Sequence, residues 1–84
     1  MTHFTTPDFW QLYNVLPRDV QQLADKNYAL LKSDPAYPSL QFKSIENVWS
    51  VRVGSHYRAV AYRQDGDFVW FWIGTHAEYD KMMP

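Results

Sequence analysis

The fold is decided by residues 49–81, which read WSVRVGSHYRAVAYRQDGDFVWFWIGTHAEYDK. Apolar and polar residues alternate along this stretch, and the alternation is interrupted at Gly54-Ser55 and at Asp65-Gly66. An alternation of period two predicts half-buried strands, and such short turn sequences join neighbouring antiparallel strands. The stretch therefore predicts two consecutive β-hairpins, followed by a short polar tail. The strands are expected over 48–53, 57–63 and 68–73.

The first forty residues follow the helical period instead. Apolar side chains recur there at i, i+3, i+4 and i+7, first at Phe9, Leu12, Tyr13 and Leu16. The spacing predicts helices over 8–17 and 18–33, which Pro17 separates. A further strand is expected over 40–45. The fold class is therefore α+β, with two antiparallel helices packed on one face of a four-stranded or five-stranded antiparallel sheet.

The register of the hairpins predicts which side chains share a face of the sheet. Pairing around Asp65-Gly66 places Arg63 opposite Phe68 and Arg58 opposite Ile73. The face expected to pack on the helices carries Trp49, Val51, Val53, Tyr57, Ala59, Ala61, Trp70 and Trp72. The opposite face carries Ser50, Arg52, Arg58, Val60, Tyr62, Val69, Phe71 and Ile73.

Composition limits the possible functions. The 84 residues suffice for one domain, expected over 1–84, and the net charge of −1 excludes a global basic field. The chain has no cysteine, so disulfides and cysteine-based zinc sites are excluded. His3, His56 and His76 lack a metal-ligand spacing, so that neither a metal nor another cofactor is expected. The longest apolar run, 68–73, is too short to span a membrane, and a cytoplasmic protein is expected.

A local cationic site is predicted at the turn of the first hairpin. Arg52 and Arg58 fall opposite or diagonal to each other across Gly54-Ser55-His56, on one face of the sheet. Like charges in this position repel each other, and a phosphate bridged by two guanidinium groups would offset the repulsion. The pair therefore indicates an anion site. Two solvent-exposed arginines are the alternative.

Four segments of the chain form a set that covers most of its length. The most specific are the hairpin S-x-R-V-G-x-x-Y-R-A-V, from Ser50, and the tail I-G-x-H-x-x-Y, from Ile73. The others are LPRDVQQLADKNYALLKSDP, from Leu16, and PSLQFK, from Pro38. Together they resemble the RelE/ParE superfamily of bacterial type II toxins. The resemblance implies two helices packed on an antiparallel sheet, with a short leading strand near 2–6, and a cognate antitoxin as partner.

The resemblance also implies roles for single residues. Arg58 matches the arginine that contacts the scissile phosphate in the nuclease branches, and Arg52 matches a basic position on the preceding strand. His76 and Tyr79 fall near a histidine and a tyrosine in the tails of several branches. The glutamate that serves as base in the YoeB-like branch has no clear counterpart near 38–40.

RNA cleavage requires particular chemical groups, and these residues can be compared with that requirement. Attack by a 2′-hydroxyl needs a base, an acid for the 5′-oxygen, and cations for the charge that develops at the phosphate. An unperturbed histidine titrates near pH 6.5, which makes His76 the best acid or base. The alternatives are a His76 that only forms a hydrogen bond at a strand end and a Tyr79 that only packs in the core. The predicted catalytic residues are Arg58, His76 and Tyr79, and the predicted substrate-binding residues are Arg52, Lys43 and Lys81.

Three functions remain open for such a chain. The favoured one is a toxin that acts as a metal-independent endoribonuclease on messenger RNA, which the RelE, YoeB and HigB branches usually cleave on the ribosome. The second is a ParE-like toxin that inhibits DNA gyrase and is no nuclease. The third is an inactive toxin fold that only binds an antitoxin. A homodimer is compatible with each of them.

Overall fold

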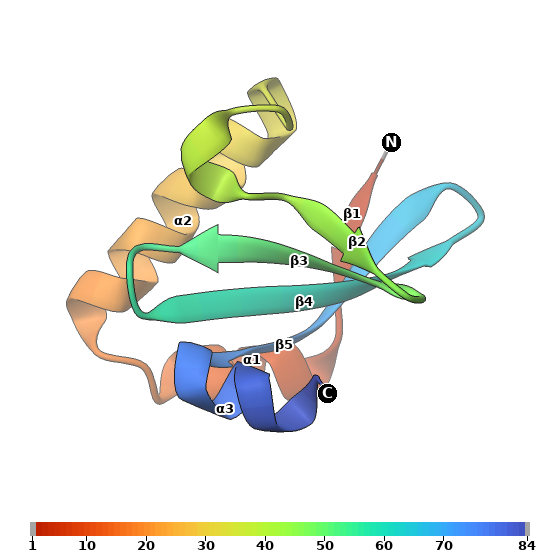
Figure 1. The fold of residues 1–84 in the computed structure, drawn as a ribbon. Helices are drawn as coiled ribbons and strands as arrows, with labels where there is room; N and C mark the ends of the chain where they lie inside the picture. The colour runs from red at the N-terminus through yellow and green to blue at the C-terminus, as the bar shows by residue number, and fades with distance from the viewer. Residues whose placement is uncertain (1, 84) are drawn as a thin grey trace.

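Five strands form one sheet, in the order β1-β5-β4-β3-β2 (Figure 1). The computed structural model describes residues 2–83. The strands are His3–Thr5 (β1), Lys43–Ile45 (β2), Val48–Val53 (β3), Tyr57–Gln64 (β4) and Asp67–Thr75 (β5). The helices are Pro7–Asn14 (α1), Arg18–Ser33 (α2) and His76–Met82 (α3), with a short 3₁₀ helix at Pro38–Leu40 (η1). The predicted α+β class is confirmed.

The two hairpins form where the alternation predicts them. β3 pairs with β4 around Gly54-Ser55-His56, and β4 pairs with β5 around Asp65-Gly66. Gly54 and Gly66 have φ of 65° and 86°, in the left-handed region that glycine adopts without strain. Each turn thus has a glycine at a position where the backbone requires one.

The sheet is mixed, whereas the sequence predicted an antiparallel one. β1 runs parallel to β5, with His3 opposite Phe68. β1 leads directly into α1, and the Oγ1 atom of Thr6 caps that helix by accepting a hydrogen bond from the N–H of Phe9 at 3.2 Å. Because β1 has no hairpin partner next to it in the chain, neither turn residues nor alternation could predict its direction.

One of the two predicted helices has the boundaries that the structure shows, and the other does not. α2 covers 18–33 as predicted, but α1 ends at Asn14 and not at residue 17. The N–H groups of Val15 and Leu16 bond to carbonyls only three residues earlier, which closes the helix with a tight turn. Pro17 also disfavours a helical backbone at the residue before it.

The strand predicted over 40–45 is reduced to the three residues of β2. Its first part forms η1 instead, and Leu40 at the end of η1 is fully buried. Gln41 follows with φ of 46°, a left-handed conformation that no strand contains. The prediction was wrong because a buried apolar residue next to a polar one looks the same in a strand and in a single helical turn.

The tail after β5, predicted only as a short polar segment, forms α3. Thr75 and Glu78 form a capping box, in which each side chain bonds to the backbone N–H of the other residue. The sequence T-x-x-E is a signature of this motif. The start of α3 could therefore have been predicted from residues 75–78.

The register of β4 and β5 changes along the strands. Arg63 lies opposite Phe68 as predicted, but Arg58 lies opposite Gly74 and not opposite Ile73. The register shifts between Val60 and Ala61, where β5 contains one residue more than β4.

The additional residue is Phe71, and the irregularity is a β-bulge. A shift of one residue moves the following side chains to the other face of the sheet. Val60 therefore pairs with Trp72 on the face opposite α1 and α2, while Ile73 packs in the core. The predicted faces of Trp72 and Ile73 were wrong for this reason.

The core lies between the sheet and the pair α1 and α2, whereas α3 packs on the other face (Figure 1). Residues from the predicted helix-facing side of the sheet fill it, namely Val51, Val53, Ala59, Ala61 and Trp70. Phe68, Leu31 and Ile73 are among its fully buried side chains. Within residues 2–83, no helix has both the length and the apolar character needed to cross a membrane.

Candidate functional site

Arg52 and Arg58 lie directly opposite each other in β3 and β4. This confirms the predicted placement of both arginines on one face. The Nε of Arg52 donates a hydrogen bond to the carbonyl of Gly54 at 2.9 Å, which holds the side chain against its own turn. The hairpin therefore brings two cations together on the face that α3 packs against.

The Arg58 side chain is buried, with only 4% of its surface exposed. Its Nη2 donates hydrogen bonds to the Oγ of Ser50 at 2.9 Å and to the carbonyl of Gln41 at 3.3 Å. Its Nε is buried without a partner among the described residues. Neither Ser50 nor Gln41 was predicted as part of the site, although a serine in a buried strand position is a signal that a polar partner lies near.

No carboxylate of residues 2–83 forms an ion pair with this buried guanidinium. Burial lowers the pKa of Arg58, the nearby Tyr79 opposes that effect, and Arg52 adds to it. A buried charge normally has a partner of opposite sign, because desolvation of an unpaired ion is costly. The arrangement therefore suits an anion that approaches from outside the protein.

α3 places two of the predicted catalytic residues next to Arg58. Tyr79 is buried and covers the guanidinium, whose carbon lies 5.2 Å from the centre of the phenol ring. The His76 ring stacks on Tyr79 at 5.8 Å between centroids. Arg58, Tyr79 and His76 thus form a continuous stack that runs from the sheet to the surface.

His76 is the exposed end of this stack, with 53% of its side chain accessible. Its Nε2 lies 3.5 Å from Oδ2 of Asp80, one turn along α3. Its backbone N–H donates to the carbonyl of His56 at 2.7 Å, which ties the start of α3 to the β3–β4 turn. An exposed imidazole beside a carboxylate can exchange protons with a bound molecule and with water.

The two predicted lysines are placed differently. Lys43 is exposed on the edge strand β2 and pairs with Ser50, so it shares the face of Arg58. Lys81 is exposed on α3 two residues after Tyr79, and residues two apart point to different sides of a helix. The structure therefore brings Lys43 to the site but not Lys81.

Glu78 is engaged in the helix cap. Hydrogen bonds from the backbone and the hydroxyl of Thr75 to the Glu78 carboxylate lower the pKa of that carboxyl. A carboxylate held in this way is a poor proton acceptor, so Glu78 contributes to the site by fixing α3.

Loss of this cap should weaken the attachment of α3. Thr75→Ala removes the hydroxyl that accepts from the N–H of Glu78 at 3.1 Å, and we expect the free energy of unfolding to fall by about 1 kcal/mol. Urea denaturation followed by circular dichroism measures it. Ser55→Ala, in an exposed turn, is the matched control and should change stability by less than about 0.5 kcal/mol. Equal effects of the two changes would contradict the role of the cap.

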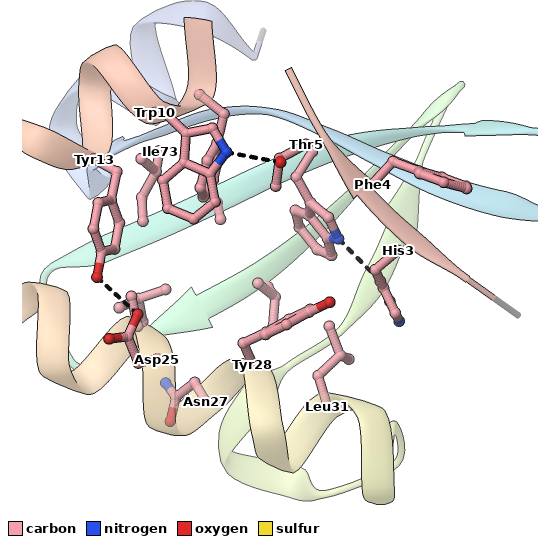
Figure 2. Close-up of a pocket in the computed structure, with 16 residues that line it drawn as sticks. His3, Phe4, Thr5, Trp10, Tyr13, Asp25, Asn27, Tyr28, Leu31 and Ile73 are labelled. Atoms are coloured by element: carbon pink, nitrogen blue, oxygen red, sulfur yellow. Dashed lines mark hydrogen bonds between the residues drawn. The ribbon is translucent and has the colours of Figure 1, made fainter. Parts of the chain in front are cut away.

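A pocket of about 400 Å³ lies on the opposite side of the sheet, between β1, α1 and α2 (Figure 2). Its lining is mostly aromatic and aliphatic, and this pocket was not predicted from the sequence. At one end Tyr13 donates to Asp25 at 2.8 Å, and at the other Trp70 donates through Nε1 to Nδ1 of His3 at 3.0 Å. Burial, and secondarily Lys32, lowers the pKa of His3.

The pocket contains none of the predicted site residues. Within residues 2–83, no group of three or more histidine, cysteine or acidic side chains could hold a metal ion. The pocket can accommodate an apolar group, whereas Arg52, Arg58 and His76 gather on the α3 face.

The sequence matches the family model of the ParE-like toxin domain over residues 18–81. The chain therefore belongs to this family, and so to the RelE/ParE superfamily of toxin–antitoxin toxins. A search of curated proteins found no match.

Solved structures show the same architecture. The RelB–RelE antitoxin–toxin complex from Methanococcus jannaschii contains a chain that is 13% identical, with a TM-score of 0.73 over 96% of this chain and 99% of that one. The YoeB/ParE toxin from Agrobacterium tumefaciens is 15% identical, with a TM-score of 0.69 over 90% of this chain and 99% of that one. The toxin–antitoxin complex RelBE2 from Mycobacterium tuberculosis contains a chain that is 18% identical, with a TM-score of 0.66 over 90% of this chain and 91% of that one. At these identities the likeness shows the fold alone, which is that of RelE/ParE toxins.

Proposed function

We propose that this toxin is an endoribonuclease that cleaves messenger RNA by attack of a 2′-hydroxyl on the adjacent phosphate. The observation that supports it most is the buried Arg58, a cation to which no described carboxylate is bound. A phosphate supplies the missing negative charge, and the charge increases in the transition state, where a fixed cation stabilises it most.

The neighbouring residues then have definite roles. Arg58 and Arg52 hold the scissile phosphate, the attacking 2′-hydroxyl gives up its proton to water, and His76 donates a proton to the departing 5′-oxygen. Tyr79 positions the guanidinium of Arg58 and supports the ring of His76. Lys43 contacts a neighbouring phosphate. The reaction leaves a 2′,3′-cyclic phosphate on one product and a 5′-hydroxyl on the other, in the cytoplasm where messenger RNA is translated.

A cognate antitoxin is the protein partner in this proposal. Several structures with this fold are toxin–antitoxin complexes. The pocket between β1, α1 and α2 could receive an apolar antitoxin side chain, since it is lined largely by aromatic and aliphatic residues. Contact on that layer would leave the α3 face free, so changes at Arg58 or His76 should leave antitoxin binding intact.

Expression of the chain from a tightly repressed promoter tests the proposal. We expect growth arrest with cleaved transcripts, mapped by primer extension, and purified protein should leave cyclic-phosphate and 5′-hydroxyl ends on RNA in the presence of a metal chelator. Growth arrest with intact transcripts and broken DNA would contradict the nuclease. The absence of any arrest would indicate a fold that only binds an antitoxin.

Inhibition of DNA gyrase is the second candidate. The match to the ParE-like toxin domain favours it, as does the position of Tyr79, which covers the guanidinium of Arg58. In this case Arg58 acts as a structural residue that fixes α3 to the sheet, and supercoiling by purified gyrase should be inhibited without loss of RNA.

A further inference from the structure

An apolar surface is exposed on the α3 face of the sheet, near the β4–β5 turn. Tyr62 on β4 is 39% exposed and Phe4 on β1 is 51% exposed. Phe4 also belongs to the rim of the pocket on the other side, and Figure 2 shows its ring pointing outward from the other lining side chains. The register places valines on the strands at either side of Tyr62. We call this surface the aromatic platform, and it consists of Phe4, Val48, Tyr62, Val69 and Phe71.

The bulge in β5 shapes the aromatic platform. It introduces Phe71 as an additional residue beside Tyr62, and the two rings lie 5.8 Å apart with an angle of 37° between their planes. α3 packs at the other end of β4, where Tyr79 reaches Ser50 and Arg58. α3 therefore leaves the ring of Tyr62 exposed and that of Phe71 half-buried, and a flat molecule can contact both.

The aromatic platform shares its face with the cations of the candidate site. Arg58 lies four residues before Tyr62 on β4, about 13 Å along the strand. Arg52 pairs with Arg58, and Lys43 lies on the same face at the edge of the sheet. One face therefore has an aromatic end and a cationic end.

We propose that the aromatic platform binds single-stranded RNA, with an unpaired base stacked on Tyr62 and Phe71 and the adjoining phosphates directed toward the exposed Lys43 and toward Arg52. Every base has a face that can stack on an aromatic ring, and the phosphates complement the cationic end. With a net charge of −1, the chain cannot gain much affinity from a general electrostatic field, so stacking must supply it.

This inference deepens the proposed function, because the bound RNA is then the substrate. Binding by the aromatic platform requires no cleavage, however, so the two proposals can fail separately. A single-stranded RNA that is 2′-O-methylated throughout cannot be cleaved by 2′-hydroxyl attack. Labelled with fluorescein, it is the probe for the binding experiment.

The experiment measures fluorescence anisotropy for four purified variants. Tyr62→Ala and Phe71→Ala should each weaken binding of the probe about 5- to 100-fold, through loss of one stacking contact. Tyr62→Leu keeps the apolar bulk that supports folding and should weaken binding similarly. Tyr28→Ala is the matched control, since Tyr28 is 42% exposed but lies on α2 and should leave binding unchanged.

Three results would overturn the inference. They are an unmodified chain that does not bind the probe, changes at Tyr62 and Phe71 that leave binding within twofold, and an equal effect of Tyr28→Ala. The second result, combined with loss of antitoxin binding or of self-association, would identify the aromatic platform as a protein interface. Binding that depends on Tyr62, in a protein that cleaves no RNA, would support this inference and contradict the nuclease.

Discussion

Replacement of Arg58 by alanine is expected to lower RNA cleavage by about 10²–10³-fold, as the loss of one preorganised charge donor does in other enzymes. The guanidinium is held by Ser50 and Gln41 and has no ion-pair partner among the described residues, so its position is fixed before a phosphate arrives. Cleavage of a synthetic RNA under single-turnover conditions measures the effect. Expression of the variant should also no longer arrest growth.

Arg58→Met is the sharper version of this experiment. Arg58 is buried beneath Tyr79, so alanine would leave a cavity and lower stability as well. Methionine fills most of the space without the charge, and replacement of a buried charge by an apolar side chain can leave stability unchanged or raise it. A variant that unfolds at the same temperature as the unmodified chain and does not cleave would assign the effect to the charge. Full cleavage by Arg58→Met would refute the role.

His76→Ala is expected to lower cleavage by about 10²–10⁴-fold, the usual contribution of a general acid. His76 is exposed and contributes a ring that stacks on Tyr79, so the change should affect stability little. The same kinetic assay measures the rate, and Asp80→Asn serves as a control that alters the neighbour but keeps the imidazole.

An RNA with sulfur in place of the 5′-oxygen distinguishes proton donation from a structural role. The thiolate leaves without protonation, so His76→Ala should cleave this substrate almost as fast as the unmodified chain does. An equal deficit on both substrates would show that His76 acts only by holding Tyr79, and would leave the acid unidentified.

The structural elements that are determined by residues close together in the chain were predictable from the sequence. α2 and both hairpins follow from the periodicity of apolar residues and from the glycine turns. The alternation of side chains between the two faces of each strand is enough to place Arg52 beside Arg58. This alternation does not reveal which element covers a face of the sheet, so the burial of Arg58 beneath Tyr79 was not predicted.

The features that were missed depend on contacts between distant segments. The bulge at Phe71 changes the faces of Trp72 and Ile73, and the continuous apolar run over 68–73 contains no polar residue that would reveal it. β1 pairs with β5 from the other end of the chain, and the pocket beside it is lined by residues of the sheet, α1 and α2. The cap at Thr75 is different, since its signature was present in the sequence.

The cover that Tyr79 provides has a consequence for substrate affinity. If Arg58 binds the scissile phosphate as proposed, the phenol ring over its guanidinium has to move aside, and the apparent dissociation constant is then the intrinsic one divided by the fraction of open molecules. Each further 1.4 kcal/mol, approximately, that favours the covered conformation reduces the apparent affinity about tenfold. A tighter attachment of α3 would therefore make the protein more stable and would weaken the binding of its substrate. Stability and substrate affinity thus make opposite demands on the seven residues of α3.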